Sequence, residues 1–390
     1  MRYVPNLDFR SLAFAEDLRA VYPSVYGYSG PSHPVSNIAG AAMANGAILP
    51  IGPLAGNSSW AITFFGPSIK CDPVNDTMHR SVREDMFMFL TAGRNASLGL
   101  NSYTLYGYMG WFPNLGKWAS SSANNTFGDS SPFYSSGSSE IRYTTSRLYH
   151  TFFMFAASPA MAQTYMTNIG SGSPWDGGLE SASLKNLPPW LDGTVVECRL
   201  LNSSYDVSFN YTEGLQQIRI QNSPTDPNTP VTLPYSVFGP AFGFNGSAFN
   251  SSNVSYKSCL KLSFGVEDAG QCIFDAEVLR TLSYQAVWDA FTAVLTGTVR
   301  YYITSQRIVN SSIIDTALTN VRELSILRGV PTDAALFGAS LKPALALYDD
   351  PRVQGLTSSY DGILNISLTD ALEEMFQNVT VSMMSSPALL

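Results

Sequence analysis

Three adjacent pairs of acidic residues come nearest to a catalytic constellation in this sequence. They are Asp349-Asp350, Glu267-Asp268 and Glu373-Glu374. Glycosidases need two carboxylates that face each other across the scissile bond. The pattern instead places Glu373-Glu374 on the polar side of a helix, Asp349-Asp350 in a helix-ending turn, and Glu267-Asp268 at a hairpin tip. No catalytic residue is therefore assigned, and a glycan-directed secreted hydrolase with an unidentified carboxylate pair is the alternative function.

Other common catalytic patterns are missing from the sequence. A zinc-dependent deformylase or protease places two histidines one helical turn apart in His-Glu-X-X-His, and none of the three histidines begins this pattern. The nucleophile elbow of a serine hydrolase requires Gly-X-Ser-X-Gly, whereas Gly170-Ser171-Gly172-Ser173 has a different spacing. No phosphate-binding or dinucleotide-binding glycine pattern is present. We therefore predict no enzymatic activity, no metal site and no cofactor.

Asparagine-linked modification is the chemistry that the sequence supports best. Twelve of the 23 asparagines begin Asn-X-Ser/Thr with X other than proline, more than chance placement gives. N-glycans on such sequons are bulky, solubilising and confined to lumenal or secreted chains. The predicted acceptors are Asn57, Asn75, Asn95, Asn124, Asn202, Asn210, Asn245, Asn250, Asn253, Asn310, Asn365 and Asn378.

Four cysteines fit two disulfides, and three connectivities are possible in principle. Cys259 and Cys272 lie 13 residues apart around a short segment typical of a hairpin closed by a bond. That pairing leaves Cys71 with Cys198. Zinc is the rival interpretation, but the sequence has no Cys-X-X-Cys and its histidines lie far from the cysteines.

The composition excludes one large class of partners. Charged residues make up 13% of the chain, about half of the usual share, and the net charge is −8. Lys and Arg are scattered singly, so no basic stripe exists to neutralise a run of phosphates. We therefore predict no binding to nucleic acid, and we expect polar residues and glycans to supply solubility.

The sequence shows neither a membrane span nor a signal peptide. Its most apolar stretch, 151–166, is about 16 residues long and contains Pro159 and Gln163, whereas a spanning helix needs about 20 apolar residues. The first ten residues include Asn6, Asp8 and Arg10 instead of an apolar segment. Because N-glycosylation requires translocation, we expect the entry segment to lie upstream of these 390 residues.

The hydrophobic patterns predict an α+β fold, with a β-rich antiparallel glycosylated region followed by a helical C-terminal region. Alternating or apolar runs predict a strand at 60–65 and consecutive antiparallel strands at 194–200, 205–209 and 217–220. Helical periods predict a short helix at 12–21 and longer ones at 275–302, 313–328, 333–347 and 370–384. Asp370 and Glu373 resemble a capping pair. We predict one ectodomain over 1–390, with 1–272 mainly β and loops and 273–390 mainly α.

Several stretches together resemble a known protein family. They are Gly46–Ile51, Asn57–Trp60, Phe64–Cys71, Cys198–Tyr205, Ser283–Phe291 and Asn378–Thr380. This set resembles a family of large filamentous-fungal membrane proteins often labelled formylmethionine deformylase-like. In that family such a region lies between transmembrane helices near the N-terminus and another near the C-terminus. The resemblance implies topology and no chemistry, because the deformylase metal pattern is missing here.

These observations lead to one functional expectation. The chain is expected to be the N-glycosylated extracellular region of a fungal membrane protein, with a role in binding, sensing or surface organisation. Its ligand or protein partner is unknown, and flanking helices outside this chain would hold it at the cell membrane. A secreted structural or adhesive protein without an anchor is a further alternative.

Overall fold

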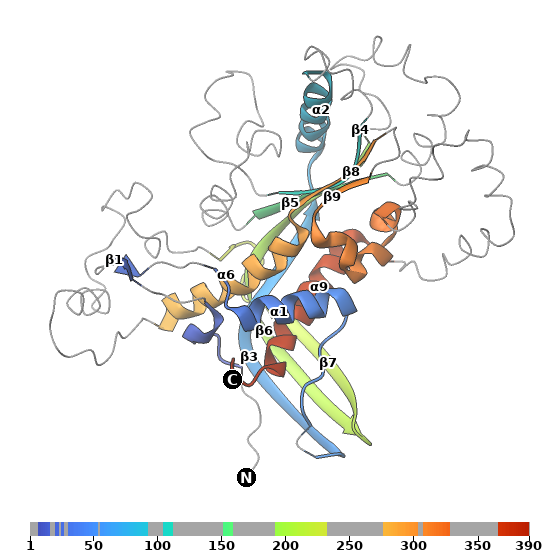
Figure 1. Cartoon of the computed structure of the whole chain (residues 1–390). Coiled ribbons are helices and arrows are strands. Elements are labelled where there is room, and N and C mark those ends of the chain that lie inside the picture. Colours follow the sequence, from blue (N-terminus) through green and yellow to red (C-terminus); the bar gives the residue numbers. More distant parts are fainter. Residues whose placement is uncertain are drawn as a thin grey trace, which may run out of the picture. The chain divides into compact units, whose positions relative to one another are not determined.

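The computed structural model describes eleven stretches of the chain (Figure 1). They are residues 7–15, 20–22, 25–26, 30–53, 55–92, 104–111, 151–158, 192–231, 276–302, 307–327 and 366–389. The chain divides into two compact units. Unit 1 comprises Met1–Lys70, Arg199–Ala293 and Glu374–Leu390, and unit 2 comprises Cys71–Cys198 and Val294–Glu373. Each unit is described by itself.

The fold is α+β, and its strands form a seven-stranded antiparallel sheet. The strand order is β3-β6-β5-β4-β8-β9, with β7 paired to β6. A separate two-stranded sheet is formed by β1 and β2. The strands are β1 (Ala20–Tyr22), β2 (Val25–Tyr26), β3 (Ser58–Pro73), β4 (Thr104–Trp111), β5 (Thr151–Ala157), β6 (Gly193–Thr212), β7 (Leu215–Pro224), β8 (Gly297–Tyr302) and β9 (Arg307–Asn310).

The described helices are of two kinds. The α-helices are α1 (His33–Asn45), α2 (Asp76–Ala92), α6 (Ala276–Leu295) and α9 (Leu368–Ser382). The short 3-10 helices are η1 (Leu12–Phe14), η9 (Ser312–Asp315), η10 (Ala317–Asn320), η11 (Arg322–Leu327) and η14 (Met383–Ser385). Helix α1 ends at Gly46, whose φ of 68° is the left-handed conformation that glycine adopts without a steric penalty.

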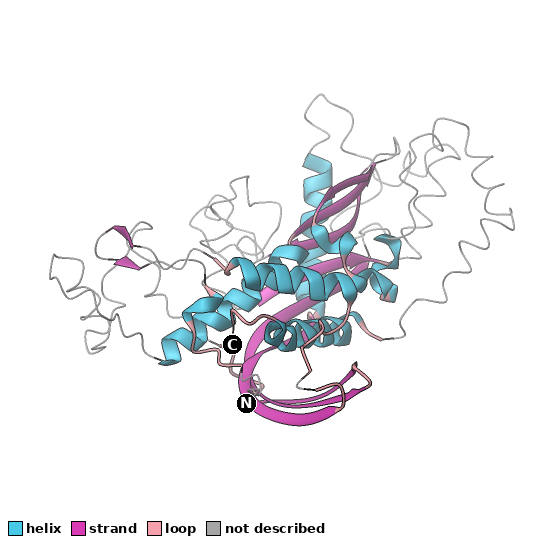
Figure 2. Cartoon of the chain, turned by 60° about the horizontal axis from the view of Figure 1, so that its bottom comes forward, coloured by secondary structure: helices cyan, strands magenta, loops and turns pink. Residues whose placement is uncertain are grey.

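In unit 1 the alternation of strand β6 separates a buried face from an exposed one. Tyr205, Val207, Phe209 and Tyr211 are buried, while the polar residues between them face solvent. Trp60 of β3 stacks on Phe209 and on Tyr211, with ring centroids 5.0 Å apart in both pairs. This aromatic layer belongs to long strands that curve strongly (Figure 2).

The hairpin between β6 and β7 in unit 1 has a two-residue turn. Thr212 pairs with Leu215, so Glu213 and Gly214 form the turn. Their φ angles are 52° and 82°, and two positive φ angles define the hairpin turn that matches the right-handed twist of the strands. The Glu213 amide donates to Asn57 Oδ1 at 2.8 Å, so the side chain that precedes β3 stabilises this turn.

The helical part of the unit 1 core is built from aromatic edge contacts. Phe376 of α9 lies edge-on to Phe291, with 5.0 Å between ring centroids, and to Trp288, with 6.1 Å. All three side chains are almost completely buried. Thr380 of α9 and Tyr205 of β6 both donate to the carbonyl of Pro67, at 3.1 and 2.6 Å. Segments far apart in the sequence are therefore joined by apolar packing and by satisfied polar groups.

In unit 2 strand β4 lies between β5 and β8. Tyr108 pairs with Ala156 of β5 and with Val299 of β8, and its hydroxyl donates to the carbonyl of Leu295 at 2.5 Å. Gly110 has no room for a side chain, because an added Cβ would collide with the backbone of Leu295 and the ring of Phe152. The close approach of these segments therefore depends on glycine.

The structure corrects several predictions from periodicity. The expected strands at 194–200 and 205–209 are one strand, β6, and 12–21 is not a single helix. The helix predicted over 275–302 ends at Leu295, because Gly297 has a φ of 125° and starts strand β8. Where one helix is predicted at 313–328, the described residues 312–327 form short 3-10 turns, interrupted where Thr316 and Val321 are extended.

Other predictions are confirmed or lie outside the described residues. The expected strands at 60–65 and 217–220 fall within β3 and β7, and the helix predicted at 370–384 is α9 followed by η14. Helices α1 and α2 were not predicted. The helix expected at 333–347 lies outside the described residues. Strands β8 and β9 lie within the segment expected to be mainly helical, and the division at residue 272 stays a prediction.

Candidate functional site: the disulfide and the sequons

The predicted pairing of Cys71 with Cys198 is confirmed. The two sulfur atoms lie 2.10 Å apart and join β3 to its neighbour β6 across a sequence separation of 127 residues. Both cysteines are buried, with 1% and 2% of their surface exposed. The second predicted disulfide, Cys259 with Cys272, lies outside the described residues. Disulfides of this kind form and persist in oxidising compartments and are rare in the cytosol.

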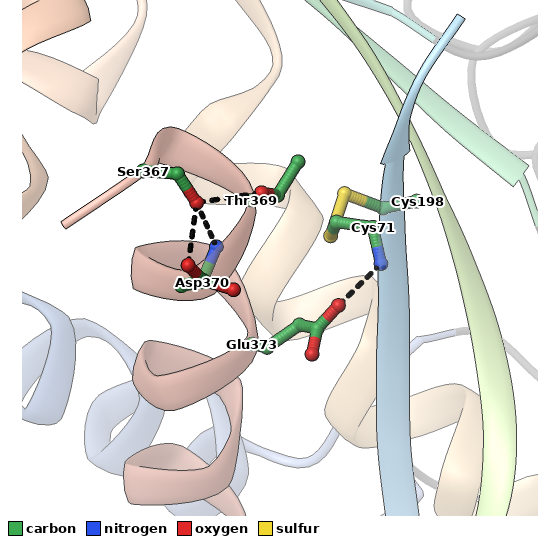
Figure 3. Close-up of a disulfide and its surroundings, with 6 residues drawn as sticks. All are labelled: Cys71, Cys198, Ser367, Thr369, Asp370 and Glu373. Atoms are coloured by element: carbon green, nitrogen blue, oxygen red, sulfur yellow. Dashed lines mark hydrogen bonds between the residues drawn. A yellow bond between two sulfur atoms is a disulfide. The ribbon is translucent and has the colours of Figure 1, made fainter.

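Glu373 lies beside this disulfide (Figure 3). Its Oε1 atom accepts a hydrogen bond from the backbone amide of Cys71 at 2.9 Å. Hydrogen bonds to a charged group are about twice as strong as neutral ones. Cys71, Cys198 and Glu373 all belong to unit 2, where Cys71 begins the first segment, Cys198 ends it and Glu373 ends the second. The disulfide and this hydrogen bond therefore join the segment ends of unit 2.

The position of Glu373 corrects the expectation for the Glu373-Glu374 pair. Glu374 is exposed, whereas Glu373 is partly buried and accepts a hydrogen bond from the Cys71 amide. Neighbouring residues on a helix point about 100° apart, so this pair does not form two facing carboxylates. No local pattern predicts this contact, because Glu373 and Cys71 are 302 residues apart. The pairs Glu267-Asp268 and Asp349-Asp350 lie outside the described residues.

The N-terminus of α9 is capped one turn earlier than predicted. Ser367 precedes the helix, and its Oγ accepts from the Asp370 amide at 3.1 Å while donating to Asp370 Oδ2 at 2.7 Å (Figure 3). Ser367 Oγ also lies 2.8 Å from Thr369 Oγ1. The capping pair is therefore Ser367 and Asp370 and not Asp370 and Glu373. Glu373 is therefore not part of the cap and accepts a hydrogen bond from Cys71 of β3.

Six of the twelve sequons lie within the described residues, and four of their asparagines are exposed. These are Asn57, Asn75, Asn210 and Asn310. Asn75 caps α2, because its Oδ1 accepts from the amide of Met78 at 2.8 Å. Asn57 Oδ1 binds the hairpin turn as described above. In both residues the described bond uses the carbonyl oxygen and not the amide nitrogen that a glycan would modify.

The other two described sequons are partly buried. Asn202 of β6 accepts from the Tyr284 hydroxyl at 2.8 Å, and its Nδ2 lies 3.4 Å from Thr225 Oγ1. Asn378 of α9 donates from Nδ2 to the Gly46 carbonyl at 3.4 Å. The six remaining predicted acceptors lie outside the described residues; they are Asn95, Asn124, Asn245, Asn250, Asn253 and Asn365.

The described histidines have local structural partners. His79 on α2 lies with Nε2 2.8 Å from the Gly193 carbonyl, and Arg83 of the same helix lies 3.8 Å from the Asp192 carboxylate. His33 at the start of α1 lies beside Asn37, with 3.2 Å between their side-chain nitrogens. Within the described stretches, no group of three or more His, Cys, Asp or Glu side chains is placed to hold a metal ion.

Comparisons with known proteins do not place the chain in a family. No family model, no curated protein and no solved structure matches it. Among the described helices, none has both the length and the apolar character required to cross a bilayer. The disulfide and the exposed sequons are therefore the described features that bear on function.

Proposed function

We propose that this chain is the N-glycosylated extracellular region of a fungal membrane protein, with a binding, sensing or surface-organising role. The observation that carries the proposal is the buried Cys71–Cys198 disulfide between two strands of the main sheet. Because the cytosol keeps thiols reduced, a disulfide in the core of a fold favours a chain that folds in the secretory pathway.

The exposed sequons support the same compartment. Asn57, Asn75, Asn210 and Asn310 lie on the surface, where a glycan is accommodated without loss of packing. Charged residues make up only 13% of the chain, so glycans would supply solubility that charge does not. The membrane attachment and the fungal origin rest on the family resemblance alone, through helices that would flank this chain.

The test is the intact mass of the chain from a secretory host, measured without reductant before and after enzymatic removal of N-glycans. We expect a large loss of mass on deglycosylation and no reactivity of Cys71 or Cys198 toward a thiol reagent. The same chain produced in a reducing cytosol is the matched control, and it should be unglycosylated and less stable. A secreted product that is unglycosylated and has reduced cysteines would refute the proposal.

The membrane attachment needs a separate test. In the full-length gene we expect apolar segments of about 20 residues on both sides of this chain. Membrane fractionation of the full-length protein should then recover it in the pellet after alkaline washing. Recovery in the soluble fraction would leave a secreted glycoprotein and remove the membrane part of the proposal.

A further inference from the structure

Whether the asparagine and the hydroxyl residue of a sequon are both accessible depends on the helix or strand that carries the sequon. Transfer of a glycan requires the Asn amide and the hydroxyl two positions later. On a strand, residues two apart point to the same face. On a helix, residues two apart point in nearly opposite directions. A sequon on a packed helix therefore has one of its two groups facing the core.

Four described sequons expose both groups. The exposed pairs are Asn57 with Ser59, Asn75 with Thr77, Asn210 with Thr212, and Asn310 with Ser312. Asn57 and Asn75 use only Oδ1 in their described bonds, so a sugar on Nδ2 leaves both bonds intact. Asn210 and Thr212 share the exposed face of β6. We call these four positions the open sequons.

The sequon at Asn378 is closed by the helix that carries it. Asn378 is partly buried and donates from Nδ2, the atom that would be modified, to the Gly46 carbonyl. Thr380 is completely buried, and its hydroxyl donates to the Pro67 carbonyl at 3.1 Å. While α9 is packed in unit 1, the Thr380 hydroxyl is inaccessible and the Asn378 amide is partly covered.

The sequon at Asn202 is closed by its neighbours. Asn202 and Ser204 lie on one face of β6, and both are partly buried. The Asn202 side chain lies between the Tyr284 hydroxyl, at 2.8 Å, and Thr225 Oγ1, at 3.4 Å. A sugar on Nδ2 would replace one of its two hydrogens beside Thr225, and the Ser204 hydroxyl that transfer requires is itself partly buried. We call Asn202 and Asn378 the closed sequons.

We propose that the secreted protein carries N-glycans at the four open sequons and none at the two closed ones. This inference rests on the proposed function, because it requires the chain to enter the secretory pathway. Glycans are attached before folding is complete, and a glycan at Asn202 or Asn378 would displace packed groups. Chains modified there would not reach the native fold and would not be secreted.

Site-resolved mass spectrometry of the secreted chain tests the proposal. The peptides are released after enzymatic deglycosylation in heavy-oxygen water, which labels each formerly occupied asparagine. We expect label at Asn57, Asn75, Asn210 and Asn310 and at least tenfold less at Asn202 and Asn378. Comparable label at a closed sequon would overturn the inference. Absence of label at every site would refute the proposed function instead.

A second measurement separates the fold from the local sequence. Cells treated briefly with a membrane-permeant reductant retain the chain without its disulfides. In this retained pool we expect label at Asn202 and Asn378, because chains modified there before folding are kept in the cell together with all the others. If both stay unlabelled there, the local sequence and not the fold prevents modification, and the inference fails. Asn378→Gln should leave the glycan mass of the secreted protein unchanged, whereas Asn210→Gln should remove one glycan.

Discussion

Units 1 and 2 are stabilised in different ways. In unit 1, side chains from distant segments donate to backbone carbonyls: Tyr205 and Thr380 to Pro67, and Tyr211 to Ile51 at 2.6 Å. Unit 2 also has a bond of this kind, from Tyr108 to the Leu295 carbonyl, but in addition a disulfide and the Glu373 hydrogen bond join the ends of its chain segments. Removal of one of these neutral hydrogen bonds should cost about 1 kcal/mol, whereas a covalent link makes the stability of unit 2 depend on the redox state. The comparison predicts that the units respond differently to the same treatments.

Removal of the disulfide is expected to have the largest effect. Cys71→Ala/Cys198→Ala opens a loop of 127 residues and should lower the free energy of unfolding by about 5 kcal/mol through the entropy of the unfolded chain. Hydrogen exchange should show loss of protection in β4 and β5 of unit 2 before β7 of unit 1. Equal loss in all three strands would show that the disulfide does not act mainly on unit 2.

The matching change in unit 1 is Phe376→Ala. It removes a completely buried ring that contacts Trp288 and Phe291 and should cost about 4 kcal/mol. Chemical denaturation measures this loss. Phe65→Ala is the control, because 53% of the Phe65 surface is exposed and its removal should change stability by less than about 0.5 kcal/mol. Similar losses for both variants would contradict the assigned core.

Alkaline pH should affect unit 1 more than unit 2. Burial raises the pKa of Tyr205 and Tyr284 in unit 1 and of Tyr108 in unit 2. Unfolded phenols ionise near pH 10, so stability is fully present below about pH 10 and falls above it, by up to about 1.4 kcal/mol per pH unit for each such tyrosine. Burial also raises the pKa of Tyr211 in unit 1, so with three such tyrosines unit 1 should lose up to about 4 kcal/mol per pH unit.

The measurement is tyrosinate absorbance followed together with hydrogen exchange as the pH is raised. Protection in β7 should fall at a lower pH than protection in β4. Tyr108→Phe is expected to make β4 less sensitive to alkali while leaving β7 unchanged. Ionisation of Tyr205 and Tyr284 at about pH 10 without unfolding would show that they are not desolvated.

The smallest expected effect concerns the Glu373 hydrogen bond. Glu373→Ala should cost about 2 kcal/mol, because the Cys71 amide loses a charged acceptor. Glu374→Ala on the exposed side of the same helix is the matched control and should be nearly neutral. Thermal unfolding of the two variants compares them directly. Equal midpoints would show that the carboxylate does not stabilise the joined ends of unit 2.

Local features of this fold follow from the sequence. The alternation in β6 and β7 predicts strands because a half-buried strand repeats every two residues, and the apolar side of α9 predicts a helix at 370–384. The Cys71–Cys198 pairing follows from the spacing of the other two cysteines. These features depend on neighbours in the sequence.

Features that depend on distant contacts do not follow from local patterns. The period of 275–302 continues as a helix in the sequence, but Gly297 approaches the backbone of Asn310 and starts a strand. The sequence pattern predicts that Glu373 is a surface residue. In the structure it contacts Cys71, which is 302 positions away in the sequence. The accessibility of a sequon also depends on whether packing buries its Ser or Thr hydroxyl, as it does for Thr380 of α9.

The disulfide also affects how the protein responds to proteolytic cleavage. Any single cut between Cys71 and Cys198 produces two fragments that remain covalently joined, because each retains one of the bonded cysteines. Such a cut adds one water to the mass of the protein. The two fragments stay attached to each other through the disulfide. A protease can therefore cut the chain between these cysteines into two fragments without releasing either, and only reduction separates them.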